Sequence, residues 1–217
     1  MNELTMLQQI AVWIWPVIFA ITVHEAAHGW MASKLGDQTA RALGRLTLNP
    51  IKHIDPIGTV VVPLVLLVLG GMVFGWAKPV PVNPKHFKHP KKDMAWVAVA
   101  GPASNLLMAI GWAICIKIGY GLMDSLPTLG AFLFYSGMAG VSINLVLLVL
   151  NLVPIPPLDG SRVVSALLPP RQAYQYNLIE PYGLFILLGL VFLGVLWPIL
   201  AVPYQALQQI IFAMVGI

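Results

Sequence analysis

Long apolar segments alternate with shorter polar connections along this chain. A membrane-spanning helix needs about 20 predominantly apolar residues. Runs of this kind lie near 5–32, 57–75, 94–118, 130–153 and 182–200, and a shorter apolar tail follows at 203–217. We expect helices, because lipid cannot satisfy the open backbone groups of other structures. The pattern predicts an all-α integral membrane protein with about five to six transmembrane helices, folded as one domain over 1–217.

The composition agrees with a lipid bilayer as the surroundings of the chain. Hydrophobic residues make up 59% of it and charged residues only 9%, whereas soluble domains carry about 25% charged residues. A net charge of +4 is compatible with nucleic-acid binding, but no basic run is interleaved with aromatic residues, so we expect no nucleic-acid partner. Cys115 is the single cysteine, which excludes an intrachain disulfide and a thiolate metal cluster.

The basic residues indicate an orientation in the membrane. They gather in the connections 34–56, 76–93 and 154–181, whereas 119–129 has none. By the positive-inside rule, these three connections face the cytoplasm. This assignment assumes a prokaryotic plasma (inner) membrane, because in an organelle only the relative sidedness would hold. Lys117 is the exception, and its long side chain can snorkel from a helix end.

Both connections that flank 57–75 are basic, so the chain should leave and return on one side of the membrane. Either 57–75 is re-entrant, or it spans and the chain returns through "GWAKPVPVNP" (75–84). The prolines disfavour a helix there, and alternating valines and prolines suit an extended, edge-like strand. Non-helical backbone at membrane depth survives only where protein or a water-filled cavity shields it, so we expect a cavity nearby.

Three titratable side chains interrupt the first apolar run, in "AITVHEAAHGW" (20–30). His24 and His28 are four residues apart and therefore share one face of a helix. This spacing allows two imidazoles to bind one Zn²⁺, with Glu25 placed to act on a water molecule. Ionisable residues inside a membrane are rare and usually functional. The alternative, that the three side chains cap a helix end and touch headgroup water, explains a lone histidine better than this ordered set.

A catalytic zinc requires a third protein ligand and one open position. We interpret the other histidines as solvated loop residues, because they lie in basic connections: His53, His86 and His89. Asp159 in "NLVPIPPLDGSRV" (151–163) is the better candidate, since it follows an apolar run and a proline-rich break before Gly160. A helix cap for Ser161 is the alternative role. If 53–93 begins and ends in the cytoplasm, Asp159 returns to the same side as the two histidines.

The combination of "HEAAH" and the later "NLVPIPPLDG" resembles the site-2 protease family of intramembrane zinc metalloproteases. "AGPASN" (100–105) is similar to the family's G-P-x-x-N element, and "GWAKPVPVN" to the stretch before it in compact members without a PDZ or CBS domain. The resemblance implies one zinc per chain, bound by His24, His28 and Asp159. It also implies that Glu25 activates the attacking water and that Asn151 stabilises an oxyanion or orients the substrate.

Several other polar and small residues in the apolar runs have structural explanations. Asn105 is expected to tie core helices together by hydrogen bonds. Gly101, Gly137 and Gly140 are interpreted as close-packing positions.

The predicted reaction is hydrolysis of a peptide bond in or near a transmembrane segment of a membrane-protein substrate. Such a helix must unwind locally, and the edge 77–83 could hold it by β-addition. A metal-binding or metal-transport protein with the same ligands is the alternative, although transport would require further intramembrane carboxylates or histidines. A non-catalytic relative is a third hypothesis, which Glu25 disfavours. The substrate and the oligomeric state stay open.

Overall fold

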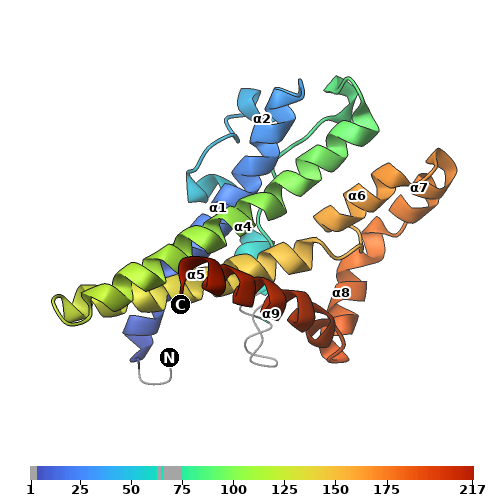
Figure 1. The fold of residues 1–217 in the computed structure, drawn as a ribbon. Helices are drawn as coiled ribbons and strands as arrows, with labels where there is room; N and C mark the ends of the chain where they lie inside the picture. Colours follow the sequence, from blue (N-terminus) through green and yellow to red (C-terminus); the bar gives the residue numbers. More distant parts are fainter. Residues whose placement is uncertain (1–3, 63–64, 66–74) are drawn as a thin grey trace.

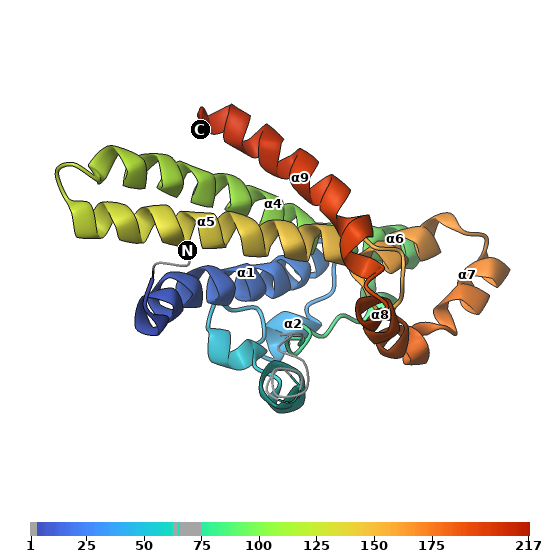
Figure 2. The same cartoon turned by 90° about the horizontal axis from the view of Figure 1, so that it is seen from below.

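Three long helices lie side by side at the centre of the molecule (Figures 1 and 2). The computed structural model describes residues 4–62, 65 and 75–217. The central helices are α1 (Met6–Lys34), α4 (Pro90–Leu122) and α5 (Pro127–Asn151). Because only residues 123–126 join α4 to α5, these two helices run antiparallel along most of their length.

The described residues contain five helical segments long and apolar enough to cross a membrane. Besides the three central helices, these are Pro170–Phe192 and Leu196–Val215. The starts of the long helices follow ordinary capping rules. Thr5 and Gln8 form a capping box at α1, and α4 and α5 each begin with a proline, whose missing N–H is not needed there. The prediction of an all-α membrane protein is confirmed.

Small residues bring α4 and α5 into close contact. An added Cβ at Gly140 would overlap the ring of Trp112, and one at Gly137 would lie 2.9 Å from Ile116 N. Near the connecting turn, an added Cβ at Gly119 would lie 2.8 Å from Gly130 O. The close-packing interpretation of Gly137 and Gly140 is therefore confirmed. A buried apolar cluster continues the contact between the helices and consists of Ala109, Ala113, Ile116, Val141, Leu145, Leu148 and Ile211.

The prediction of one membrane-spanning helix over 182–200 is wrong, because these residues belong to two helices. α8 (Gly183–Phe192) ends just before Gly194, and α9 (Leu196–Val215) begins just after it. Gly194 has φ +69°, a left-handed conformation that terminates helices and suits glycine. The apolar tail 203–217 consequently belongs to α9 up to Val215. This helix lies against α5 and α4 on the side away from α1 (Figure 2).

Lys117 has a partner inside the protein. Its Nζ donates to Val215 O at 2.6 Å, in the last turn of α9. Carbonyls at a helix C-terminus lack intrahelical partners and attract positive charge. The amine of this residue, within a membrane-spanning segment, thus binds a helix end of its own chain.

Short elements connect α1 to α4. They are α2 (Thr39–Ala42), η1 (Pro50–His53), η2 (Pro56–Val61) and η3 (Pro84–His86). The predicted run 57–75 begins as the π-helical η2, but 63–64 and 66–74 lie outside the described residues. Whether this run is re-entrant or spans therefore stays a prediction.

Residues 75–83 contain neither a helix nor a strand ladder within the described part of the chain. They are held instead by single hydrogen bonds, from Trp76 N to Gly58 O at 3.0 Å and from Lys78 N to His53 O at 2.9 Å. Pro79 and Pro81 have no N–H to donate, so a regular ladder is interrupted at these two positions.

Candidate metal centre

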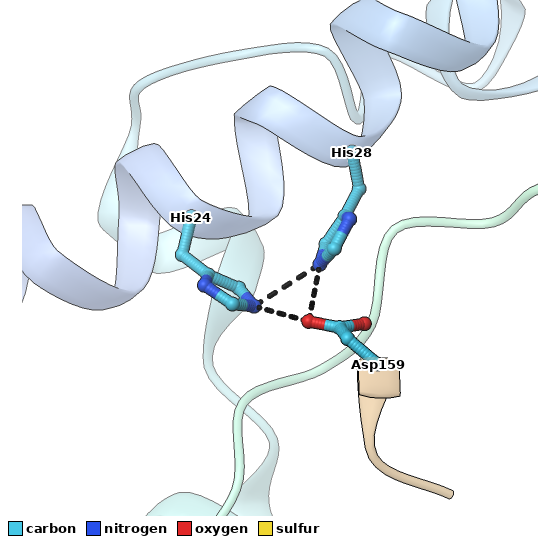
Figure 3. Close-up of side chains that lie close together, drawn as sticks. All are labelled: His24, His28 and Asp159. Carbon is cyan, nitrogen blue, oxygen red and sulfur yellow. Dashed lines mark hydrogen bonds and ion pairs between the residues drawn. The ribbon is translucent and has the colours of Figure 1, made fainter. Parts of the chain in front are cut away.

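The three residues predicted as metal ligands come together in the structure (Figure 3). His24 and His28 project from α1, and Asp159 is the first residue of α6 (Asp159–Leu167), which packs against α4. The two histidine Nε2 atoms lie 3.0 Å apart, and each is 3.3 Å from Asp159 Oδ2. The α1 spacing and the later "LDG" turn therefore produce one compact group of ligand atoms.

The hydrogen bonds of the imidazoles direct lone pairs into this group. His28 Nδ1 lies 2.7 Å from Val97 O, and His24 Nδ1 lies 2.6 Å from Asn105 Oδ1. A carbonyl oxygen only accepts, so each neutral ring carries its proton on Nδ1 and leaves Nε2 as an acceptor. Asp159 Oδ2 is buried and has no hydrogen-bond donor among the described residues.

Three largely enclosed acceptor atoms that face one another favour a positive charge between them. Tetrahedral zinc with ligand bonds of about 2.1 Å places its ligand atoms roughly 3.4 Å apart, close to the 3.0 Å and 3.3 Å separations here. Two imidazoles and one carboxylate are also a usual donor set for catalytic zinc. The residues thus fit the metal in number, chemistry and spacing.

Gly101 allows α4 to pass directly against the two imidazoles. An added Cβ at this position would overlap His28 Nε2 and lie 2.7 Å from His24 Cε1. The close-packing interpretation of Gly101 is confirmed, and the neighbours that it accommodates are two of the predicted metal ligands.

Asn105 joins all three central helices, as expected, and also contacts a ligand. Its Nδ2 donates to Asn144 Oδ1 at 2.8 Å and to Ala20 O at 3.3 Å. Sequence reasoning missed Asn144, although an amide in the middle of an apolar run signals an interhelical hydrogen bond.

Glu25 faces the extended segment 75–83. Its Oε2 accepts a hydrogen bond from Val80 N at 2.8 Å, and the side chain of Val80 lies against α1 at Gly29. The segment therefore reaches the glutamate that sits between the two ligand histidines in the sequence.

The remaining candidates lie outside the ligand group. Asn151 Nδ2 donates to Leu147 O of its own helix at 3.0 Å. His86 and His89 are exposed, as expected, but the interpretation of His53 as a solvated residue is wrong. His53 is only 2% exposed, because its Nε2 bonds to Thr47 O at 2.9 Å within the folded connection.

A second buried acid, Asp37, fixes the segment that carries Val80. Its carboxylate accepts from Asn83 N at 2.7 Å, His86 Nδ1 at 2.8 Å and Thr39 N at 3.0 Å. Burial alone would raise the pKa of Asp37, but the hydrogen bonds from Thr39, Asn83 and His86 outweigh it and lower the pKa to about 2. Asp37 therefore stays ionised and ties the end of 75–83 to the turn after α1.

Comparison with known proteins now identifies the family. The chain is 44% identical over 190 residues to "Putative zinc metalloprotease YwhC" of Bacillus subtilis, covering 85% of this chain and 83% of that protein. The chain belongs to the site-2 protease-like family of zinc metalloproteases. It is also 29% identical over 174 residues to "Putative zinc metalloprotease Rip2" of Mycolicibacterium smegmatis, covering 80% of this chain and 63% of that protein.

A shorter match is to "Putative zinc metalloprotease MJ0611" of Methanocaldococcus jannaschii, with 35% identity over 69 residues. No family model matches the chain, and no solved structure matches it. The relatives, the apolar helices and the ligand group together make this chain a membrane zinc metalloprotease.

Proposed function

We propose that this metalloprotease hydrolyses peptide bonds in or near transmembrane segments of membrane-protein substrates. The observation that supports this most is the position of the ligand group. His24 and His28 lie within α1, a helix long and apolar enough to cross a membrane, and the group is largely enclosed between α1, α4 and α6. A peptide bond that reaches these ligands must therefore approach at the depth of the membrane-spanning helices.

His24, His28 and Asp159 hold the zinc, which when bound polarises the scissile carbonyl and lowers the pKa of water. Glu25 takes the proton of the attacking water and later gives it to the leaving amine. Among the described residues, Val80 N is the hydrogen-bond donor to this carboxylate, and it engages Oε2. Oε1 thus remains for proton transfer.

Asn151 is proposed to stabilise the oxyanion or to orient the substrate. Its amide uses one N–H on Leu147 O, so its second N–H and its oxygen remain for other partners. It lies eight residues before Asp159 on the chain segment that delivers this ligand.

The segment 77–83 is proposed to hold an unwound substrate by β-addition. The N–H groups of Lys78, Val80 and Asn83 bond within the protein, and the prolines have none. The carbonyl oxygens of Lys78 and Pro79 accept from the Arg45 guanidinium. Among the described residues, the N–H groups of Ala77 and Val82 have no partner, and these groups are left to pair with a substrate backbone. Val82→Pro should therefore lower cleavage while zinc binding is retained, and unchanged cleavage would count against this role. The same change at Val80 is less informative, because it also removes the partner of Glu25.

The orientation is proposed from the basic connections, with the active site toward the cytoplasmic side of a prokaryotic plasma membrane. Single cysteines in a Cys115→Ser background test this. Lys92→Cys should react with an impermeant maleimide in inverted vesicles, and Asp124→Cys should react in right-side-out vesicles. The opposite labelling pattern would show that the active site faces the other side of the membrane.

The central experiment compares the native protein with Glu25→Gln in detergent for zinc content and for cleavage of a model transmembrane substrate. Both should bind about one zinc, as a three-ligand site does, and only the native protein should cut. Asp124→Asn, a change at the exposed α4–α5 connection, is the matched control and should cut normally. If native protein and Glu25→Gln both bind zinc and neither cuts any of a panel of substrates, the metal-binding or metal-transport alternative is favoured. If neither binds zinc, the three ligands are wrongly assigned.

A further inference from the structure

We propose that Asn144 of α5, acting through Asn105 of α4, fixes His24 in the tautomer that binds zinc. Asn144 and Asn105 are thus positioning residues of the metal centre. The inference rests on the zinc centre described above and adds to it a chain of side-chain amides that begins on a different helix.

The chain of hydrogen bonds is continuous from α5 to the ligand. Asn144 Nδ2 donates to Gly140 O at 2.9 Å. Asn144 Oδ1 accepts from Asn105 Nδ2 at 2.8 Å. Asn105 Oδ1 lies 2.6 Å from His24 Nδ1.

The direction of this chain is set at its far end. Gly140 O is a backbone carbonyl and can only accept, so Asn144 must turn its NH₂ group toward it and its oxygen toward Asn105. Asn105 must then donate, and its NH₂ group also faces a second carbonyl, Ala20 O, at 3.3 Å. Its oxygen is left for His24, which must carry the proton on Nδ1 and present the lone pair of Nε2.

Burial makes the direction difficult to reverse. Asn105 and Asn144 are both 0% exposed, and His24 is 7% exposed. Turning either amide around would place donor against donor or acceptor against acceptor, without water to compensate. Buried networks of this kind tolerate one fully satisfied arrangement far better than any other.

The two ligand histidines are therefore fixed by different means. His28 Nδ1 bonds to the backbone carbonyl of Val97, which no side-chain substitution removes. His24 depends on two side-chain amides, so its tautomer responds to substitution on α5, a helix that supplies no ligand to the group. Partners of this kind commonly alter metal affinity by about 10–100-fold.

Asn144→Leu tests the inference, because it removes both polar groups and keeps the branched shape of the side chain. We expect zinc to bind on the order of 10-fold more weakly or worse, measured by competition with a chromogenic chelator in detergent. In zinc-free protein with ¹⁵N-labelled histidine, native His24 should be protonated on Nδ1, and the variant should show a mixture of tautomers. Ser136→Ala, at another buried polar position of α5, is the matched control and should leave both results unchanged.

A rescue variant distinguishes the effect of the hydrogen-bond direction at Asn105 from a general packing defect at position 144. A carboxylate at position 105 offers an oxygen to His24 whichever way it turns, but its second oxygen loses the hydrogen bond to Ala20 O. The double variant Asn144→Leu/Asn105→Asp should therefore regain part of the zinc affinity. The inference is overturned if Asn144→Leu binds zinc like the native protein, or if the folded double variant binds no better than Asn144→Leu. Should Asn144→Leu fail to fold, Asn144→Ala replaces it with the same expectations. If the native protein itself bound no zinc, the proposed zinc centre would be refuted instead.

Discussion

Two buried aspartates show how hydrogen-bond donors decide what the same side chain does. Asp37 receives donors from Thr39, Asn83 and His86 and is fully satisfied by protein. Asp159 has a buried oxygen that faces only the Nε2 atoms of two histidines. The first carboxylate therefore works as a structural tie, and the second keeps an oxygen available for the metal ion that we propose.

Asp37→Asn should destabilise the protein at neutral pH by about 1.5–3 kcal/mol, the usual contribution of hydrogen bonds to a charged group. The folded pKa of about 2 lies below the ordinary value of 3.8, so ionised Asp37 stabilises the fold above about pH 4. That contribution is lost as the pH falls from about 4 to about 2. Thermal unfolding of both proteins in detergent should thus differ at pH 7 and converge near pH 2. An equal difference at both pH values would contradict this assignment.

Gly101→Ala should weaken zinc binding by about 10-fold, the lower end of what disturbed ligand orientation usually costs. The new Cβ would overlap His28 Nε2, so the ring must move. Gly111→Ala is the control, because it lies on the same helix and an added Cβ there has no neighbour within 4 Å. Chelator competition measures both variants, and equal affinities would show that α4 yields without disturbing the ligands.

At the scale of elements, hydropathy predicts where apolar helices exist but not where they break. α1, α4 and α5 coincide with apolar runs bounded by polar residues, prolines or both. The run 182–200 is apolar on both sides of Gly194, so only the left-handed backbone at that residue marks the break. The residues of the site likewise differ in whether the sequence predicts their role. HExxH and "LDG" predict the ligands, whereas Asn144 acquires its role only when three helices pack together.

Gly194→Ala should destabilise the protein by about 1–2 kcal/mol, since a side chain at φ +69° meets the steric cost of the left-handed region. Gly189→Ala, within α8 and with open space around an added Cβ, should be neutral or slightly stabilising, because alanine favours a helix. The unfolding midpoints of the two variants in detergent give the comparison. Similar midpoints would mean that the α8–α9 connection shifts to a right-handed turn at little cost.

At the scale of the whole molecule, the ligand group joins parts of the chain that are far apart in sequence. His24 and His28 belong to α1, and Asp159 begins α6. Gly101 of α4 packs against the two imidazoles, and Asn105 of α4 links His24 to Asn144 of α5. Without a cation, the three acceptor atoms repel one another and destabilise this arrangement. With one, the same contacts hold α6 against the central helices. Zinc is therefore expected to contribute to the stability of the fold as well as to catalysis.

Removal of zinc should lower the unfolding temperature of the native protein. A ligand that binds only the folded state at 100 times its Kd stabilises that state by about 2.7 kcal/mol. Glu25→Gln should show the same zinc-dependent shift, because Glu25 is not one of the three ligands. His24→Ala and Asp159→Ala should show little or none, since each removes a ligand atom. The measurement is thermal unfolding in detergent with excess chelator and with stoichiometric zinc. A shift that persists in both ligand variants would place the zinc elsewhere in the chain, and a shift lost in Glu25→Gln would make that carboxylate a ligand.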